Sequence, residues 1–283
     1  MYTLSVQNKY GEQLELTNNE SYVISEIDGL DPPEAVINST RNVNADGSIF
    51  NNSYLTNRQI IITLAINQPA ETNRINLYKY IKNKYPIRIY YENDTRKVYI
   101  DGFVKNFDIN FFGIKQIAQI TIICVNPYFL ADSENETELS EVEALFEFPF
   151  ETPEPIPFSE VGEDVHFIVM NNGDVETGAV FELHVRGGSV TNPMIYNVET
   201  NEFIGFNMTL NAGDSLVINT NTKEKSAMYY PVNAAGQSAL GHMMFNSTWL
   251  QLVSGANYFG ISANSNTDRI TVTVTSTDKY EGV

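Results

Sequence analysis

The segment Arg58-Gln-Ile-Ile-Ile-Thr-Leu-Ala-Ile66 decides the class of fold in the first half of the chain. Its β-branched residues favour an extended strand, and Asn57 before it and Asn67-Gln-Pro69 after it are typical of strand ends. In the second half, Arg269-Ile-Thr-Val-Thr-Val-Thr-Ser276 alternates strictly between apolar and polar side chains. Such alternation indicates a strand with one buried and one solvated face. Both halves are therefore predicted to be mainly β.

Further short strands surround the first of these segments. They are expected at 86–91, 97–100, 103–112 and 114–124, with a hairpin loop at 92–96, a bend at Asp101-Gly102 and a tight turn at Asp46-Gly47. This spacing of strands predicts a β-barrel or β-sandwich domain.

One helix is predicted in this domain, over Glu71–Tyr85. Thr72 or Asn73 can cap its start, and apolar residues recur at helical spacing. Three lysines crowd its C-terminal end, where they favour the helix dipole. Pro86 prevents the helix from continuing.

The second half has candidate strands at Thr177–Arg186, Asp214–Asn219 and Asn257–Ser262, in addition to Arg269–Ser276. Glycines separate these segments. The pattern predicts an antiparallel β-sandwich of the jelly-roll type.

The two halves differ in charge. Residues 1–131 carry 12 basic and 13 acidic side chains, whereas residues 132–283 carry 5 and 22. Between Asp132 and Asp164 there are twelve acidic residues and no Lys or Arg, and Glu151-Thr-Pro-Glu-Pro-Ile-Pro-Phe158 holds three prolines. We therefore predict an N-terminal domain at 1–131, an acidic, proline-rich linker at 132–164 and a C-terminal β-sandwich at 165–283.

Bulk composition excludes several classes of function. The net charge of −18 disfavours nucleic acid as a stable partner, and no apolar run approaches the roughly 20 residues of a membrane helix. The N-terminus lacks the pattern of a signal peptide, so we expect a protein made in a cytoplasm, which leaves it only within a larger particle. The single cysteine, Cys124, is expected to be a small buried residue.

Candidate chemistry is sparse. Ser238 and His242 lie in Gly236-Gln-Ser238-Ala-Leu240-Gly241-His242, which resembles a nucleophile elbow but has Leu240 where the second glycine is required. We expect a flexible loop there, with an esterase as a remote alternative. No cofactor and no metal ligand set is predicted. Tyr229 and Tyr230 are the candidate residues for contact with a glycan.

The first half resembles the N-terminal domain of phage distal tail proteins, the siphovirus-type tail component family. The resemblance rests on motifs in order along the chain. These are Gly29-Leu-Asp-Pro-Pro33, Asp46-Gly-Ser-Ile-Phe50, the strand with its leading Arg58, the helix at 71–85 with the hairpin after it, and Ile122-Ile-Cys-Val-Asn-Pro-Tyr-Phe129.

The second half resembles the galectin-like or carbohydrate-module-like sandwich of the same family. The matching segments are Asn171-Asn-Gly-Asp174, Gly187–Met194, Leu210–Asp214, Ser247–Asn257 and the last strand, Ile270–Thr275. The family has no catalytic residues to transfer, so no enzyme activity is expected.

The resemblance implies a hexameric ring at the tip of a long non-contractile tail, joining the tail tube to the tail-tip hub and anchoring receptor-binding proteins. Ring closure would be easier through the nearly neutral N-terminal domains than through the acidic C-terminal ones. A defective prophage or a tail-like bacteriocin could use the same component. The alternative function is a carbohydrate-binding adhesin that contacts host surface glycans.

Overall fold

The computed structural model describes residues 2–42, 46–113, 115–139 and 165–283 and is mainly β, as predicted. The chain forms two compact units. Unit 1 comprises Met1–Asp132 and Lys279–Val283, and unit 2 comprises Ser133–Asp278. The last five residues therefore return to the unit in which the chain begins.

These boundaries differ from the predicted ones at both ends of unit 2. Strand β11 (Asn135–Leu139) lies inside the predicted linker but pairs with β22 (Ile270–Ser276). Strand β23 (Lys279–Tyr280) leaves the predicted C-terminal sandwich and pairs with β10 (Phe129–Ala131) of unit 1. Both short segments find backbone hydrogen-bond partners that charge and proline content could not indicate. The rest of the predicted linker, residues 140–164, lies outside the described residues.

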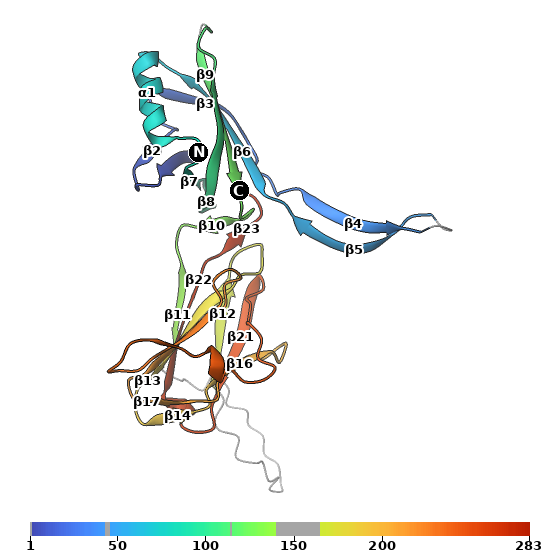
Figure 1. Ribbon diagram of the computed structural model, residues 1–283, viewed down its shortest axis with the longest axis vertical. Coiled ribbons are helices and arrows are strands. Elements are labelled where there is room, and N and C mark those ends of the chain that lie inside the picture. Colours follow the sequence, from blue (N-terminus) through green and yellow to red (C-terminus); the bar gives the residue numbers. More distant parts are fainter. Residues whose placement is uncertain (1, 43–45, 114, 140–164) are drawn as a thin grey trace. The chain divides into compact units, whose positions relative to one another are not determined.

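Unit 1 is built on one large antiparallel sheet (Figure 1). Its strand order is β2 (Gln13–Glu15), β1 (Thr3–Asn8), β7 (Pro86–Glu92), β8 (Lys97–Ile109), β9 (Gln116–Cys124), β6 (Arg58–Ile66) and β3 (Tyr22–Asp28), with β10 and β23 attached beside β8. Alternate residues of β6 and β9 point inward to form the core. Cys124 is buried among them, as predicted.

The helix α1 (Ala70–Tyr80) packs its Leu77 into this core. It is shorter than predicted and ends five residues before Tyr85. The reason is competition for hydrogen bonds: the N–H of Lys84 donates to the carbonyl of Val104, and the N–H of Val104 donates to the carbonyl of Tyr85. Lys84 and Tyr85 thus extend the pairing of β7 with β8. Neither Thr72 nor Asn73 caps the helix, which begins after Pro69. Nδ2 of Asn73 donates instead to the carbonyl of Asn67 at 3.0 Å.

The predicted bend at Asp101-Gly102 is absent, because β8 runs straight through it. Gly102 instead permits close packing between strands. A Cβ atom at this position would lie 2.6 Å from Cγ2 of Ile122 and 2.9 Å from Sγ of Cys124. The hairpin loop at 92–96 is confirmed: Oδ1 of Asn93 accepts hydrogen bonds from the N–H groups of Thr95 and Arg96.

Unit 2 is a β-sandwich. Its first sheet has the order β11, β22, β13 (Ala179–Val185), β18 (Ser215–Asn219), β19 (Ser226–Tyr230) and β20 (Gln237–Ser238). Its second sheet has the order β12 (Val165–Asn171), β21 (Gly255–Ser262), β15 (Met194–Asn197) and β16 (Phe203–Gly205), and β14 (Ser189–Thr191) pairs with β17 (Thr209–Asn211). Two short 3-10 helices, η1 (Leu240–His242) and η2 (Thr267–Arg269), complete the unit.

The core of unit 2 contains the residues that alternation predicted. Ile270, Val272 and Val274 of β22 are all buried, and they share one cluster with Phe181 of β13 and Phe259 of β21. The rings of Phe181 and Phe259 meet edge to face, with centroids 5.5 Å apart. Among the residues that the structure describes, no helix is long and apolar enough to cross a membrane.

Candidate functional site

A hairpin of two strands, β4 (Ala35–Arg41) and β5 (Ser48–Leu55), which we call the arm, is almost entirely exposed. Among the strands that the structure describes, these two pair only with each other. Figure 1 shows the arm projecting away from the large sheet of unit 1. An isolated two-stranded hairpin is marginally stable in water, so the arm is expected to need a partner.

Both faces of the arm carry apolar side chains. The register pairs Ser39 with Phe50 and Ile37 with Ser53, so Ile37 and Phe50 share one face. Thr40 pairs with Ile49, which lies on the opposite face together with Tyr54. The exposed fractions of these four apolar side chains are 67% for Ile37, 62% for Phe50, 58% for Ile49 and 54% for Tyr54. Exposed apolar side chains that are grouped in this way mark protein interaction surfaces.

Neutral polar pairs hold the two strands of the arm together. Nδ2 of Asn38 donates to Oδ1 of Asn52 at 2.8 Å, and Nδ2 of Asn51 donates to Oγ1 of Thr40 at 2.8 Å. Between residues 35 and 55 the sequence has one basic and one acidic side chain. The arm can therefore approach a like-charged protein without a large electrostatic cost.

The base of the arm is fixed by Arg58, the first residue of β6. Its guanidinium donates from Nη1 to the carbonyls of Gly29 and Asp31, both at 2.6 Å, just ahead of β4. Nε donates to the carbonyl of Pro127 at 2.7 Å, and Nη2 donates to the carbonyl of Glu281. One side chain thus joins the arm, the end of the large sheet and the C-terminus.

Arg58 is 3% exposed, and its Cζ lies 4.6 Å from the ring centroid of Phe129. Burial lowers the pKa of Arg58 from its ordinary value, because a charged group is less stable away from water. The four carbonyl groups and the aromatic ring replace the lost water. Gly29 has a φ of +88°, and a Cβ atom there would lie 2.1 Å from the carbonyl oxygen of Gln59.

We predict that Arg58→Met lowers the free energy of unfolding of unit 1 by about 3 kcal/mol, because buried carbonyls lose their donor. Urea denaturation measures this change. Lys97→Met is the matched control: Lys97 is 59% exposed and pairs with Asp132 at 3.2 Å, so its loss is expected to change the free energy of unfolding far less. Equal effects of the two substitutions would contradict the anchoring role of Arg58.

Tyr229 and Tyr230, the predicted glycan contacts, are neighbours on β19 and point to opposite faces of its sheet. The hydroxyl of Tyr229 donates to Oδ2 of Asp214 at 2.7 Å, and its ring packs against the core. Tyr230 is 44% exposed, and a Cβ atom on Gly236 would lie 2.5 Å from its ring. Contact of these two tyrosines with a glycan stays a prediction. Because the rings lie on opposite faces of the sheet, they cannot stack on the same sugar side by side.

Asp214 is 3% exposed and accepts three hydrogen bonds. Besides the hydroxyl of Tyr229, the N–H groups of Asn211 and Val232 donate to its carboxylate, at 2.8 and 3.1 Å. Burial is the largest single influence on the pKa of Asp214 and raises it, but these hydrogen bonds together lower it below its ordinary value. The hydrogen bond to Asp214 raises the pKa of Tyr229 to about 12.

This pKa shift predicts a pH dependence of stability. The neutral hydroxyl of Tyr229 is favoured in the folded state, so its contribution is fully present below the ordinary tyrosine pKa of about 10 and is lost as pH rises through about 12. Tyr229→Phe should lower the free energy of unfolding by about 1 kcal/mol at neutral pH. The difference from the unmodified protein should shrink above about pH 10, as urea denaturation at several pH values can show.

Tyr230→Phe is the control, because this hydroxyl makes no hydrogen bond to any described residue. It should leave the free energy of unfolding nearly unchanged at every pH. A Tyr229→Phe effect that stays constant from neutral to alkaline pH would show that the hydrogen bond to Asp214 is not its source.

The structure does not assemble an esterase site around Ser238 and His242. Ser238 is exposed on β20, which pairs with β19, and His242 ends the three-residue helix η1. No hydrogen bond joins the two side chains. Within the described ranges, no group of three or more His, Cys, Asp or Glu residues could hold a metal ion.

Reasoning from the sequence did not identify the arm or the anchoring role of Arg58. A signal for the arm was present, because Val36-Ile37 and Ile49-Phe50 place apolar residues on both sides of Asp46-Gly47. Such segments usually pair within a larger sheet, so their exposure could not be inferred. No local pattern indicates that Arg58 binds a carbonyl 223 residues further along the chain.

Comparisons with known proteins agree with these observations. Residues 172–280 match the family described as siphovirus-type tail component, C-terminal domain, and residues 9–124 match the phage tail protein RIFT-related domain. Together the two matches span most of the chain. A search of curated proteins finds no match.

Solved structures share the fold. The crystal structure of the SPP1 Dit (gp 19.1) protein, described as a paradigm of the hub adsorption apparatus in phages that infect Gram-positive bacteria, matches with a TM-score of 0.68 and 13% identity over 99% of both chains. Chains of the phage P2 baseplate in its activated conformation match over the full length of both chains at 10% identity. Their TM-scores are 0.51 for the form with Ca and 0.52 for the form with Sr.

Proposed function

We propose that this chain, which belongs to the siphovirus-type tail component family, closes a hexameric ring through contacts between its N-terminal units. It is a structural distal tail protein and a component of the tail tip of the virion. The observation that carries the ring proposal is the arm, whose apolar side chains find no partner within the described part of their own chain.

The partner that we propose for the arm is unit 1 of a second copy. In a ring, each subunit presents one surface to the next, and a projecting hairpin that is apolar on both faces can lie against its neighbour. The C-terminal residues bound by Arg58 and Arg96 keep the base of the arm in place. A fixed base lowers the conformational entropy lost when the arm binds.

The distribution of charge favours unit 1 over unit 2 as the self-associating part. Unit 1 has 13 basic and 15 acidic residues, whereas unit 2 has 4 and 20. Copies of unit 1 can therefore meet with little repulsion, while copies of unit 2 repel one another over distances of about 10 Å at ordinary salt.

The ring would join the tail tube protein to the tail-tip hub protein and provide attachment for a receptor-binding protein. In this role we propose no enzyme activity, no stable binding of nucleic acid and no insertion into a membrane. The lack of a hydrogen bond between Ser238 and His242 supports the first point. The alternative function, a carbohydrate-binding adhesin, is not favoured, because both family matches are to tail components.

The double substitution Ile37→Asp with Phe50→Asp tests the ring proposal, because it places two charges on one apolar face of the arm. We expect native mass spectrometry to show hexamers of the unmodified protein and monomers of the variant at the same concentration. The variant should keep its thermal unfolding midpoint, since the arm packs against no core.

The matched control is Val232→Asp with Val253→Asp, which changes two exposed apolar residues of unit 2. This variant should assemble like the unmodified protein. Assembly that survives the substitutions in the arm would rule out the arm as the ring contact.

A further inference from the structure

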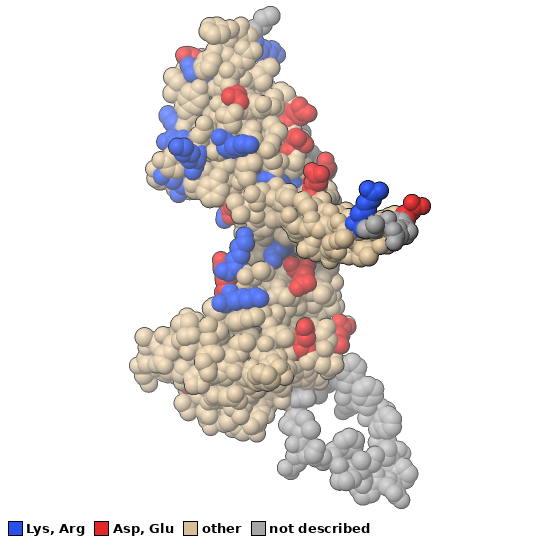
Figure 2. All heavy atoms as spheres, turned by 45° about the vertical axis from the view of Figure 1, so that its right-hand side comes forward, with Lys and Arg blue, Asp and Glu red and all other residues tan. Residues whose placement is uncertain are grey.

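Five lysines lie on neighbouring segments of unit 1, and all are exposed. They are Lys9 after β1, Lys79 in the last turn of α1, Lys82 and Lys84 in the segment after the helix, and Lys105 in β8. We call them the lysine cluster. Figure 2 shows Lys and Arg side chains gathered on one side of this unit.

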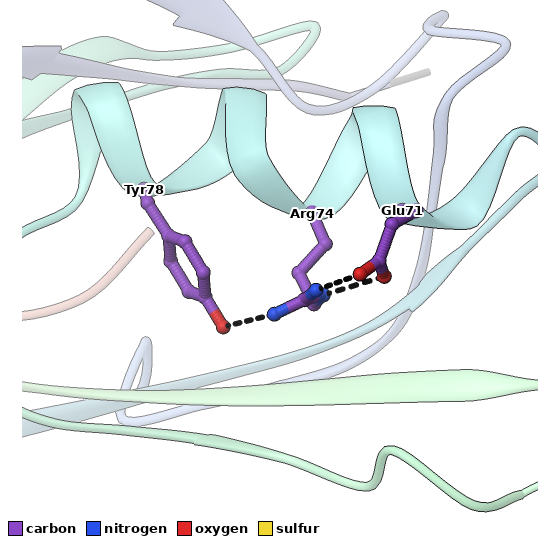
Figure 3. A network of polar contacts seen from close by, with 3 residues as sticks. All are labelled: Glu71, Arg74 and Tyr78. Carbon is purple, nitrogen blue, oxygen red and sulfur yellow. Dashed lines mark hydrogen bonds and ion pairs between the residues drawn. The ribbon is translucent and has the colours of Figure 1, made fainter.

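None of the five lysines pairs with a carboxylate among the described residues. A contrast is provided by Arg74 on the same helix, whose charge is satisfied locally (Figure 3). Its guanidinium donates to both carboxylate oxygens of Glu71 and, from Nη1, to the hydroxyl of Tyr78 at 3.2 Å. The lysine cluster therefore keeps positive charge available for a partner.

Lys84 occupies a costly backbone conformation. Its φ is +70°, in the left-handed region that L-residues with a Cβ atom rarely adopt. The other non-glycine residues with positive φ in the described chain are all asparagines, which tolerate this region. Glycine or asparagine would fit position 84 better, so the presence of a lysine indicates a use for its charge.

Lys105 is placed by a second backbone irregularity. The pairing of β8 with β9 shifts between Val104 and Asn106, which leaves Lys105 as the extra residue of a β-bulge. Such bulges redirect a side chain. The N–H of Lys84 donates to the carbonyl of Val104, and the N–H of Val104 donates to the carbonyl of Tyr85. Lys84 therefore lies beside the residue that precedes Lys105.

Tyr85, next to Lys84, is 44% exposed and has Nζ of Lys9 4.0 Å from its ring centroid. Two irregular backbone positions and one cation–π contact thus bring uncompensated lysines to one surface.

We propose that the lysine cluster is a docking surface for the acidic surface of another protein of the tail. This inference rests on the proposed role in tail assembly, but it concerns a surface separate from the arm. The chain as a whole carries −18, so its net charge repels an acidic partner, whereas the lysine cluster attracts one. The cluster would therefore set both the position and the orientation of that partner.

The charge of the rest of the chain favours a carboxylate-bearing protein over DNA. The large net negative charge opposes a long polyanion, whose phosphates would extend beyond the cluster.

The test is a fluorescence anisotropy titration of the full-length protein with labelled poly-L-glutamate, short enough to stay within the cluster, and, separately, with labelled duplex DNA. We expect binding of poly-L-glutamate that weakens with salt. Lys84→Glu with Lys105→Glu should weaken it at least about tenfold. Lys115→Glu with Lys223→Glu, which changes two exposed lysines outside the cluster, should alter it less than about twofold.

Lys84→Gly separates the effect of this residue on binding from its effect on stability. It should raise the midpoint of urea denaturation, because glycine relieves the left-handed backbone, and it should weaken poly-L-glutamate binding about threefold. A variant that gains stability and binds unchanged would overturn the proposal.

Two other outcomes would also overturn it. Tighter binding of DNA than of poly-L-glutamate would make the cluster a nucleic-acid surface. A change in oligomer mass of the Lys84→Glu/Lys105→Glu variant in native mass spectrometry would make it a contact between copies of this chain. If this variant keeps its oligomer mass but its poly-L-glutamate binding is unchanged, the docking proposal fails while the ring proposal, which depends on the arm, still stands.

Discussion

The buried guanidinium of Arg58 joins three segments of unit 1 that are far apart in the sequence to the start of β6. It binds the carbonyls of Gly29 and Asp31 before the arm, of Pro127 after β9 and of Glu281 near the C-terminus. These four carbonyls lie outside the strands and accept no hydrogen bond from any strand that the structure describes. The guanidinium supplies their hydrogen-bond donors, and the carbonyls solvate its charge. The chain must therefore return from unit 2 before unit 1 is complete. The arm, whose own pairing is marginal, inherits its fixed base from this junction.

Charge and backbone geometry assign different tasks to different surfaces. Apolar side chains on an almost uncharged arm suit contact between identical copies, because their burial lowers the free energy and electrostatic repulsion between the copies is small. The lysine cluster suits the opposite case, a partner of unlike charge, and it is held in place at the cost of a left-handed Lys84 and a bulged Lys105. Unit 2, with 20 acidic and 4 basic residues, adds net charge that keeps copies of itself apart.

Local patterns predicted most of the strands but not what closes the fold. Alternation in β22 identified a buried face because each residue of a strand faces either the core or water. The end of α1 was missed because Lys84 and Tyr85 pair with β8, a contact that helix propensity does not include. The predicted unit boundaries differ from the observed ones because β11 and β23 are short strands, which form only by pairing with strands distant in the sequence. The resemblance to tail components indicated the function. The arm could be recognised only from the exposure of its side chains in the structure.

The most direct test of this account is native mass spectrometry of unit 1 alone. Leu130 pairs with Lys279, so residues 133–278 can be replaced by a short Gly-Ser linker that keeps the C-terminal strand. The account predicts that this protein folds and forms hexamers, and that a fragment ending at residue 131 is less stable because Arg58 loses the carbonyl of Glu281. A folded, linker-joined unit 1 that remains a monomer at high concentration would contradict the claim that this unit closes the ring.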